Sequence, residues 1–243
     1  MVTGHVRHMQ LTDPRKVRVE YGKRIWSEVF DHNPRIAWAR DLNVQVYEAR
    51  PNGLRPYASA KSALRWTWQD YRPYVGELYF QPDELAYAAR FTPDVVIEPN
   101  LKGMASPNKD WGGDRWVALA RMMAKAGIRP VQLGGAGTRL MGPPVEFIET
   151  RNFRHACAVL ARARAAVLTE GGLHHGAAAV GLKAVVIFGG YISPHQTGYD
   201  LHVNLFSGGT ACGMRTTCPH CKQAMAKITP EEVFSRLQGL LRG

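Results

Sequence analysis

Residues 168–190, LTEGGLHHGAAAVGLKAVVIFGG, contain the pattern that decides the fold. Apolar residues lead to Glu170, and two glycines and two histidines follow. A run of small residues then precedes a second apolar segment that ends in a glycine pair. We interpret this as strand, turn, helix and strand. Because neither apolar run alternates with polar residues, we expect both strands to be buried on both faces, as in a parallel sheet.

The same alternation runs through the chain from residue 93 onward. Trp116, Leu119 and Met123 share one helical face, and Thr229 and Glu232 have the spacing of a capping box. The sequence therefore predicts an α/β fold with a Rossmann-like parallel sheet, which binds ligands at the carboxyl ends of its strands. We expect strands at residues 94–99, 129–135, 145–150, 164–170 and 183–190, and helices at 113–127, 153–163, 173–181 and 229–241.

Residues 1–92 follow a less regular pattern that is rich in aromatic side chains. We expect short strands at 17–19 and 44–47 and a helix at 82–90, with Pro82 in its first turn. A boundary near Pro93 would divide the chain into an abbreviated N-terminal α/β domain (1–92) and a ligand-binding domain (93–243). We interpret the aromatic stripe WTWQDYRPY (66–74) as core packing rather than a stacking platform.

Composition limits the class of protein. The 243 residues include 31 Lys and Arg against 20 Asp and Glu, a net charge of +11 that is spread along the chain. Such an excess fits an anionic partner: a nucleotide diphosphate, a lipid phosphate or a nucleic acid. The sequence contains no apolar run of membrane-spanning length and no signal-peptide core at its start. Four cysteines do not make a secreted disulfide framework, so we expect a cytoplasmic protein.

The turn after the 164–170 strand has the composition of an anion site. Gly171 and Gly172 leave backbone N–H groups open at a helix N-terminus, which carries about half a positive charge. Glu170 is suited to accept hydrogen bonds from sugar hydroxyls, and His174 or His175 lies within reach of a phosphate. The alternative is a tight turn whose histidines only cap or pack.

A second candidate lies in the stretch SPNKDWGGDRW (106–116), which follows the first strand of this unit. Lys109 falls in a strand-to-helix loop, where a lysine ammonium can neutralise a diphosphate. The alternative is a solvated surface lysine. Ser106 and Asn108 lie beside it as candidate hydrogen-bond donors.

The order of these motifs resembles the family 9 glycosyltransferases, the lipopolysaccharide heptosyltransferase-like enzymes of GT-B fold. Lys-x-Trp, a VQLGG strand, an acid-x-Gly-Leu-x-His turn, VVIFGG and the ending CPHCKQAMAKITPEEV occur in the family's order over residues 93–243. The resemblance implies a GT-B donor domain that binds a nucleotide-diphosphate sugar. The donor-binding residues that it implies are Lys109, Glu170, Gly171, Gly172, His175 and Thr197, and we add Ser106 and Asn108 as assisting hydrogen-bond donors.

The implied reaction is an inverting sugar transfer to a glycan, a lipid-linked sugar or a nucleic acid. It needs no cofactor, because Lys109 and the helix N-terminus would stabilise the departing diphosphate. Two departures from the family pattern affect this expectation. Glu170-Gly171 stands where the family has Asp and Ser or Thr. Residues 1–10 (MVTGHVRHMQ) resemble the helix that follows the family's N-terminal strand and Gly-Asp turn, whose Asp is the family's general base. Either the true start of the protein lies upstream, or the base is supplied elsewhere, or the protein no longer catalyses, so the catalytic base stays unassigned. Asp13, Glu20, Asp31, His5 and His8 are candidates by residue type only.

Cys212, Cys218 and Cys221 form a C-x5-C-x2-C pattern. Close thiols of this spacing bind structural Zn²⁺ or iron, and a fourth ligand would come from His220, His202 or Cys157. The alternative is a loop with three reduced thiols. A rival function uses the same features: a non-catalytic or phage-type protein that binds or modifies nucleic acid through its positive charge, its aromatic residues and a cysteine knuckle.

Overall fold

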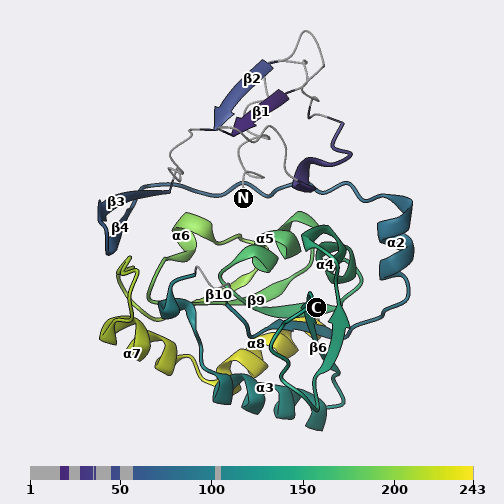
Figure 1. Ribbon diagram of the computed structural model, residues 1–243. Helices are drawn as coiled ribbons and strands as arrows, with labels where there is room; N and C mark the ends of the chain where they lie inside the picture. The colour runs from purple at the N-terminus through teal and green to yellow at the C-terminus, as the bar shows by residue number, and fades with distance from the viewer. Residues whose placement is uncertain are drawn as a thin grey trace.

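The fold comes from a computed structural model of the chain, which describes residues 17–21, 28–34, 36, 45–49, 57–101 and 105–242 (Figure 1). Its centre is a six-stranded parallel sheet in the order β7-β6-β5-β8-β9-β10. The chain builds outward from β5 to β7 and then returns to place β8 on the other side of β5. The strands are β5 Val95–Glu98, β6 Pro130–Gly134, β7 Glu146–Glu149, β8 Ala165–Thr169, β9 Ala184–Gly189 and β10 Val203–Phe206.

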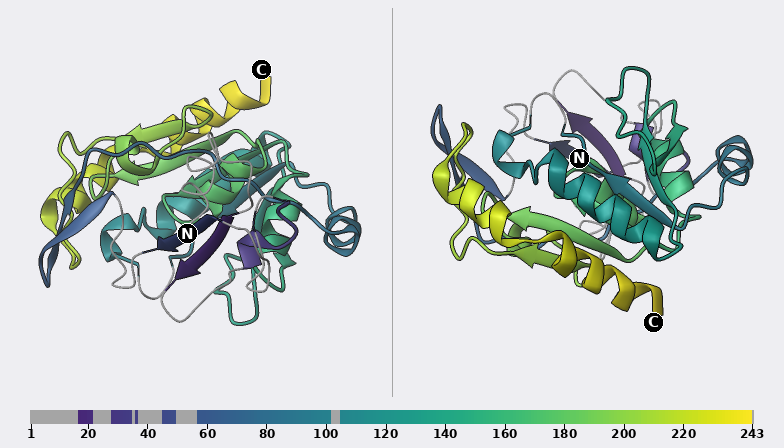
Figure 2. Two further views of the ribbon diagram at one scale, coloured as in Figure 1. Left: turned by 90° about the horizontal axis from the view of Figure 1, so that it is seen from above. Right: turned by 90° about the horizontal axis from the view of Figure 1, so that it is seen from below.

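Helices cover both faces of this sheet, which explains the continuous apolar strands. α3 (Gly113–Lys125) and α8 (Pro230–Arg242) pack against one face, as the right-hand panel of Figure 2, seen from below, shows. α4 (Phe153–Leu160) and α5 (Gly172–Ala179) pack against the other. Successive residues of a strand point to opposite faces. Val95 and Ile97 therefore lie in the α3–α8 core, and Val96 lies in the α4–α5 core.

Residues 57–92 pack onto this unit. α2 (Pro82–Ala88) lies against α4, and Arg154 on α4 binds the buried Glu84 carboxylate with two hydrogen bonds of 2.6 and 2.7 Å. The antiparallel hairpin of β3 (Ala58–Ser62) and β4 (Arg65–Trp68) brings Trp66 and Trp68 against the core. The Trp68 indole donates to the Tyr191 carbonyl at 3.0 Å. The prediction that these tryptophans pack is confirmed.

Most elements expected from the sequence are present. β1 (Val17–Tyr21) and β2 (Gln45–Ala49) pair in parallel where short strands were predicted. The Glu232 amide donates to Thr229 Oγ1 at 3.2 Å, as the cap spacing predicted. The sequence did not predict the β3–β4 hairpin. It also did not predict five further elements, which are η1 (Glu28–Phe30), η2 (Pro107–Lys109), α6 (Pro194–Thr197), β10 and α7 (Pro219–Lys227).

Some predictions lie outside the described residues. These include the interpretation of residues 1–10 and the roles of His5, His8 and Asp13. The domain boundary near residue 92 stays a prediction. Among the described helices, none has both the length and the apolar character needed to cross a lipid bilayer.

Candidate functional site

The strand order reverses between β5 and β8, and a cavity lies at the carboxyl ends of these two strands. Glu98 ends β5, while Thr169 and Glu170 lie at the end of β8, and all three line the cavity. Its volume of about 540 Å³ is typical of a small-molecule site. Parallel α/β sheets bind ligands at such a reversal. We therefore take this space, called the switch-point cavity below, as the candidate site.

Segments distant in sequence complete the cavity wall. The β3–β4 hairpin contributes Trp66, the chain after β9 contributes Tyr191, and the segment before α7 contributes Arg215 and Thr216. The sequence did not single out Tyr191, Arg215 or Thr216 as site residues. They follow no recognisable motif, and only the tertiary packing brings them to the strand ends.

Lys109 and Glu170 meet in this cavity as an ion pair. The Lys109 side chain is 16% exposed and that of Glu170 is 6% exposed, so both charges are largely shielded from water. Burial alone would raise the pKa of the Glu170 carboxyl, but the Lys109 ammonium, His174 and the Thr197 hydroxyl lower it below its ordinary value. The carboxylate is therefore ionised and holds the ammonium at the strand ends.

The N-terminus of α5 faces the same cavity, through Gly171 and Gly172. The Gly171 amide donates to Nδ1 of His174 at 2.9 Å, so it is not free for a ligand. This corrects the expectation that both glycine amides are open. Gly172 begins the helix, and the first amides of a helix have no partner within it. Of the two glycines, Gly172 is therefore the candidate for an anion contact.

The two histidines of α5 are structural in this geometry. His174 is fully buried, accepts from Gly171 and donates through Nε2 to the Thr197 carbonyl at 2.8 Å. His175 Nδ1 bonds the Tyr199 hydroxyl at 2.7 Å, and His175 is not among the residues that line the cavity. Burial and the neighbouring His174 hold the pKa of His175 well below its ordinary value, so it is neutral. The structure thus does not bring His175 to a phosphate position.

Thr197 was expected beside the donor and is instead buried behind Glu170. Glu170, His174 and His175 have side-chain atoms close enough to suggest a metal site. Both ring nitrogens of His174 are already used, one accepting and one donating. This leaves no lone pair on His174 for an ion.

Ser106 and Asn108 have different positions. Ser106 lines the cavity and its hydroxyl donates to the Met214 carbonyl at 3.1 Å. Asn108 is buried, and its amide group donates to the carbonyls of Met214 and Thr216, both at 2.7 Å. Its side-chain oxygen accepts from the Cys218 amide at 2.9 Å. Both amide hydrogens are used, so we correct the expectation for Asn108: it holds the segment before α7 and not a ligand.

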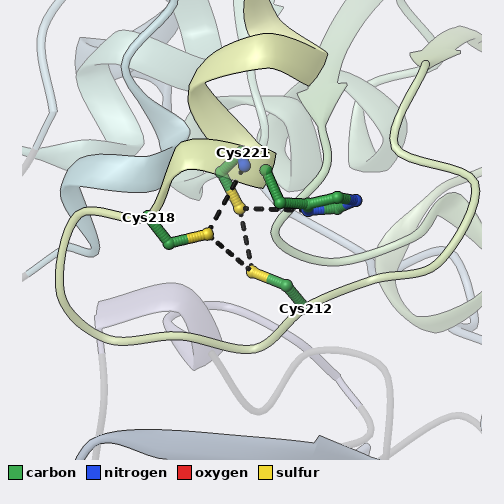
Figure 3. Close-up of side chains that lie close together, drawn as sticks. Cys212, Cys218 and Cys221 are labelled. Carbon is green, nitrogen blue, oxygen red and sulfur yellow. Dashed lines mark hydrogen bonds between the residues drawn. The ribbon is translucent and has the colours of Figure 1, made fainter.

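That segment leads into a cluster of three cysteines and one histidine, called the Cys3His cluster below. One potential ligand atom from each of Cys212, Cys218, His220 and Cys221 lies within 4.8 Å of the others, close enough to hold a metal ion. The three thiols are free, and Figure 3 shows the sulfur atoms turned toward one another at the start of α7. Of the other two predicted ligands, His202 is buried and donates from Nε2 to the His174 carbonyl at 3.2 Å, and Cys157 lies on α4.

Comparisons with known proteins give the fold a context. No family model matches the chain, and no curated protein matches it. Among solved structures, the chain is similar to ADP-heptose lipopolysaccharide heptosyltransferase II of Escherichia coli, with 21% identity and a TM-score of 0.51 over 68% of this chain and 53% of that one. It is also similar to a family 9 glycosyl transferase of Veillonella parvula, with 16% identity and a TM-score of 0.54 over 72% of this chain and 56% of that one.

A third similar structure is the iron-containing heptosyltransferase TibC of enterotoxigenic E. coli in complex with ADP-heptose. The identity is 16% and the TM-score 0.51, over 73% of this chain and 50% of that one. The chain spans about half the length of each of these structures. The expected α/β fold of GT-B heptosyltransferases is thereby confirmed.

Proposed function

We propose that this chain binds a nucleotide-diphosphate sugar in the switch-point cavity and belongs to a glycosyltransferase that moves the sugar with inversion. The observation that carries the proposal is the Lys109–Glu170 ion pair at the N-terminus of α5, in a fold shared with heptosyltransferases. An ammonium and a helix N-terminus both favour a diphosphate. A carboxylate beside them favours the hydroxyls of a ribose or sugar.

The pair suits this ligand in its details. A lysine ammonium has three donors, so Lys109 can keep its bond to Glu170 and still offer two to phosphate oxygens. Gly172 adds an amide from the first turn of α5. Arg215, exposed on the wall of the same cavity, places a second cation near the opening. The donor class to try first is ADP-heptose, with which one of the similar structures was solved.

In the proposed sugar transfer, Lys109 and the α5 N-terminus act on the departing diphosphate. The acceptor hydroxyl oxygen bonds to C1 of the sugar, its proton passes to a base, and the bond from C1 to the diphosphate breaks. The electron pair leaves with the diphosphate, whose growing charge Lys109 and the α5 N-terminus stabilise. Because these cationic groups are already in place, the proposed reaction needs no metal at the diphosphate. The acceptor is a glycan, a lipid-linked sugar or a nucleic acid.

Calorimetric titration of the full chain with ADP, UDP and AMP tests the donor site. We expect both diphosphates to bind, AMP to bind more weakly, and Lys109→Ala to lower diphosphate affinity about tenfold or more, the range for a charge-assisted contact. Lys125→Ala is the matched control, because Lys125 is an exposed lysine at the end of α3. If neither diphosphate binds, or if Lys109→Ala binds as the parent does, the proposal is wrong.

A further inference from the structure

The four ligand atoms of the Cys3His cluster are grouped closely enough to surround one metal ion, and one sulfur–sulfur distance matches a tetrahedral site, whereas the Cys212–Cys221 pair must widen by about 0.9 Å to admit the ion. Zinc–sulfur bonds of about 2.3 Å place two sulfurs of a tetrahedral site about 3.8 Å apart. Sγ of Cys212 lies 3.7 Å from Sγ of Cys218 and 2.9 Å from Sγ of Cys221, and Nδ1 of His220 lies 3.9 Å from Sγ of Cys221. These separations exceed a disulfide bond of about 2.05 Å.

The surroundings fix the ligand atoms in the orientation that a metal needs. Nε2 of His220 lies 2.8 Å from the Gly208 carbonyl, which only accepts, so Nε2 carries the hydrogen and Nδ1 keeps its lone pair toward the sulfurs. The amides of Met214 and Cys221 each lie 3.4 Å from a sulfur, on Cys212 and Cys218 respectively. Such N–H groups stabilise thiolates, the form in which cysteine binds metals.

The segment between the ligands forms part of the switch-point cavity. Cys212 is anchored by its amide to the Gly190 carbonyl at 3.0 Å, and its own carbonyl accepts from Arg65 Nε at 2.8 Å. Cys218 is tied to Asn108, the residue before Lys109. Arg215 and Thr216, which line the cavity, lie between these two anchors.

We propose that Cys212, Cys218, His220 and Cys221 bind one tetrahedral metal ion, Zn²⁺ or iron, and that this ion fixes the wall of the switch-point cavity through Asn108. The metal is structural and takes no part in sugar transfer. Four protein ligands close its coordination and leave no position for a substrate. The effect on the cavity rests on the proposed nucleotide function, whereas the metal site stands without it.

Metal content of the purified full chain tests the site directly. Elemental analysis should find zinc or iron at one ion per chain. After removal of the metal under reducing, oxygen-free conditions, Co²⁺ should produce thiolate-to-cobalt charge-transfer absorption and the strong visible bands of a tetrahedral site. Cys218→Ser and His220→Ala should each weaken zinc binding by about tenfold or more, measured against a chromophoric chelator.

Two control variants separate ligands from other residues of the same kind. Cys157→Ala removes the thiol on α4, and His195→Ala removes an exposed imidazole on α6, so both should bind metal as the parent does. A reduced chain that takes up no metal, or a His220→Ala variant with unchanged affinity and spectrum, would overturn the ligand assignment.

Hydrogen exchange then tests the link to the cavity. Removing the metal should speed amide exchange in residues 105–109 and 212–218 and weaken ADP binding, and restoring Zn²⁺ should reverse both changes. Equal exchange with and without metal would refute the link. A chain that binds metal and gains this protection but binds no nucleotide would refute the proposed function and leave the metal site intact.

Discussion

Lys109 and Glu170 form an ion pair although each reaches the cavity from a different strand-to-helix connection. Lys109 ends η2 in the connection from β5 to α3, and Glu170 lies in the turn from β8 to α5. β5 and β8 are neighbours in the sheet, so both connections emerge at the point where the strand order reverses. The pair therefore joins the two halves of the sheet at the cavity.

Removing only the cation of this ion pair should destabilise the protein more than removing both charges together. Lys109→Ala leaves a buried carboxylate without its cation and should lower the free energy of unfolding by about 3 kcal/mol. The double variant Lys109→Ala/Glu170→Gln removes the unpaired charge and should recover most of that loss. Urea denaturation of the three proteins measures both effects. Equal instability of the single and double variants would show that the carboxylate is not held by Lys109.

The stability of the parent and that of the Lys109→Ala variant should change in opposite directions as the pH falls. In the parent, the folded pKa of Glu170 lies below the ordinary value of 4.5. Its stabilising contribution is therefore present above pH 4.5 and is lost as the pH falls through the lower folded pKa. In Lys109→Ala, burial dominates and raises the folded pKa above 4.5, so the penalty is largest near neutral pH and fades on acidification. The stability gap between parent and variant should narrow from pH 7 to pH 4, and a constant gap would contradict this.

Substitutions of Asn108 test whether this residue holds the segment before α7 or contacts a ligand. Its side chain is buried and makes three hydrogen bonds to residues 214–218, so Asn108→Ala should cost about 3 kcal/mol and speed exchange of the Cys218 amide. Asn108→Asp keeps the shape and the bond from Cys218 but sets a carboxylate against two carbonyl oxygens, so it should be at least as unstable. If Asn108→Ala instead weakened ADP binding with little loss of stability, the original expectation of a ligand contact would be correct.

The sheet could be predicted because its signal is local. β5, β6, β8 and β9 are short, largely apolar runs bounded by turn residues, and burial on both faces removes the polar alternation, whereas the edge strand β7 carries a glutamate at each end and is mostly exposed. β4 carries alternating tryptophans, yet its partner β3 contains polar and small residues (ASAKS) without an apolar periodicity. That hairpin depends on contacts with Tyr191 and with the segment before α7, which local sequence does not encode.

The sequence predicted where the site residues lie in the fold, but not which groups they bind. Sequence order placed Lys109 and Glu170 at strand ends, and the fold brings them together. It could not show that the Gly171 amide is taken by His174, nor that Asn108 is taken by carbonyls more than a hundred residues away. His220 and His202 were equal candidates for the fourth ligand, and only the fold turns His220 toward the thiols.

Gly213 should be required for the contact between the β3–β4 hairpin and the segment that follows the cluster residue Cys212. It has φ of +67°, its carbonyl accepts from the Trp66 amide at 2.9 Å, and a Cβ there would overlap the Trp66 carbonyl oxygen. Gly137 is the matched control, because it has φ of +80° with nothing within 4 Å of a Cβ. Gly137→Ala should cost about 1–2 kcal/mol, the penalty of left-handed backbone alone.

Gly213→Ala should cost more than twice as much as Gly137→Ala, because the backbone of β4 must move to admit the methyl group. Thermal unfolding of the two variants measures the difference. The Gly213 variant should also bind Zn²⁺ more weakly, since the displaced residue follows the ligand Cys212. Equal losses of stability in both variants would mean that the close approach of Gly213 to Trp66 contributes nothing.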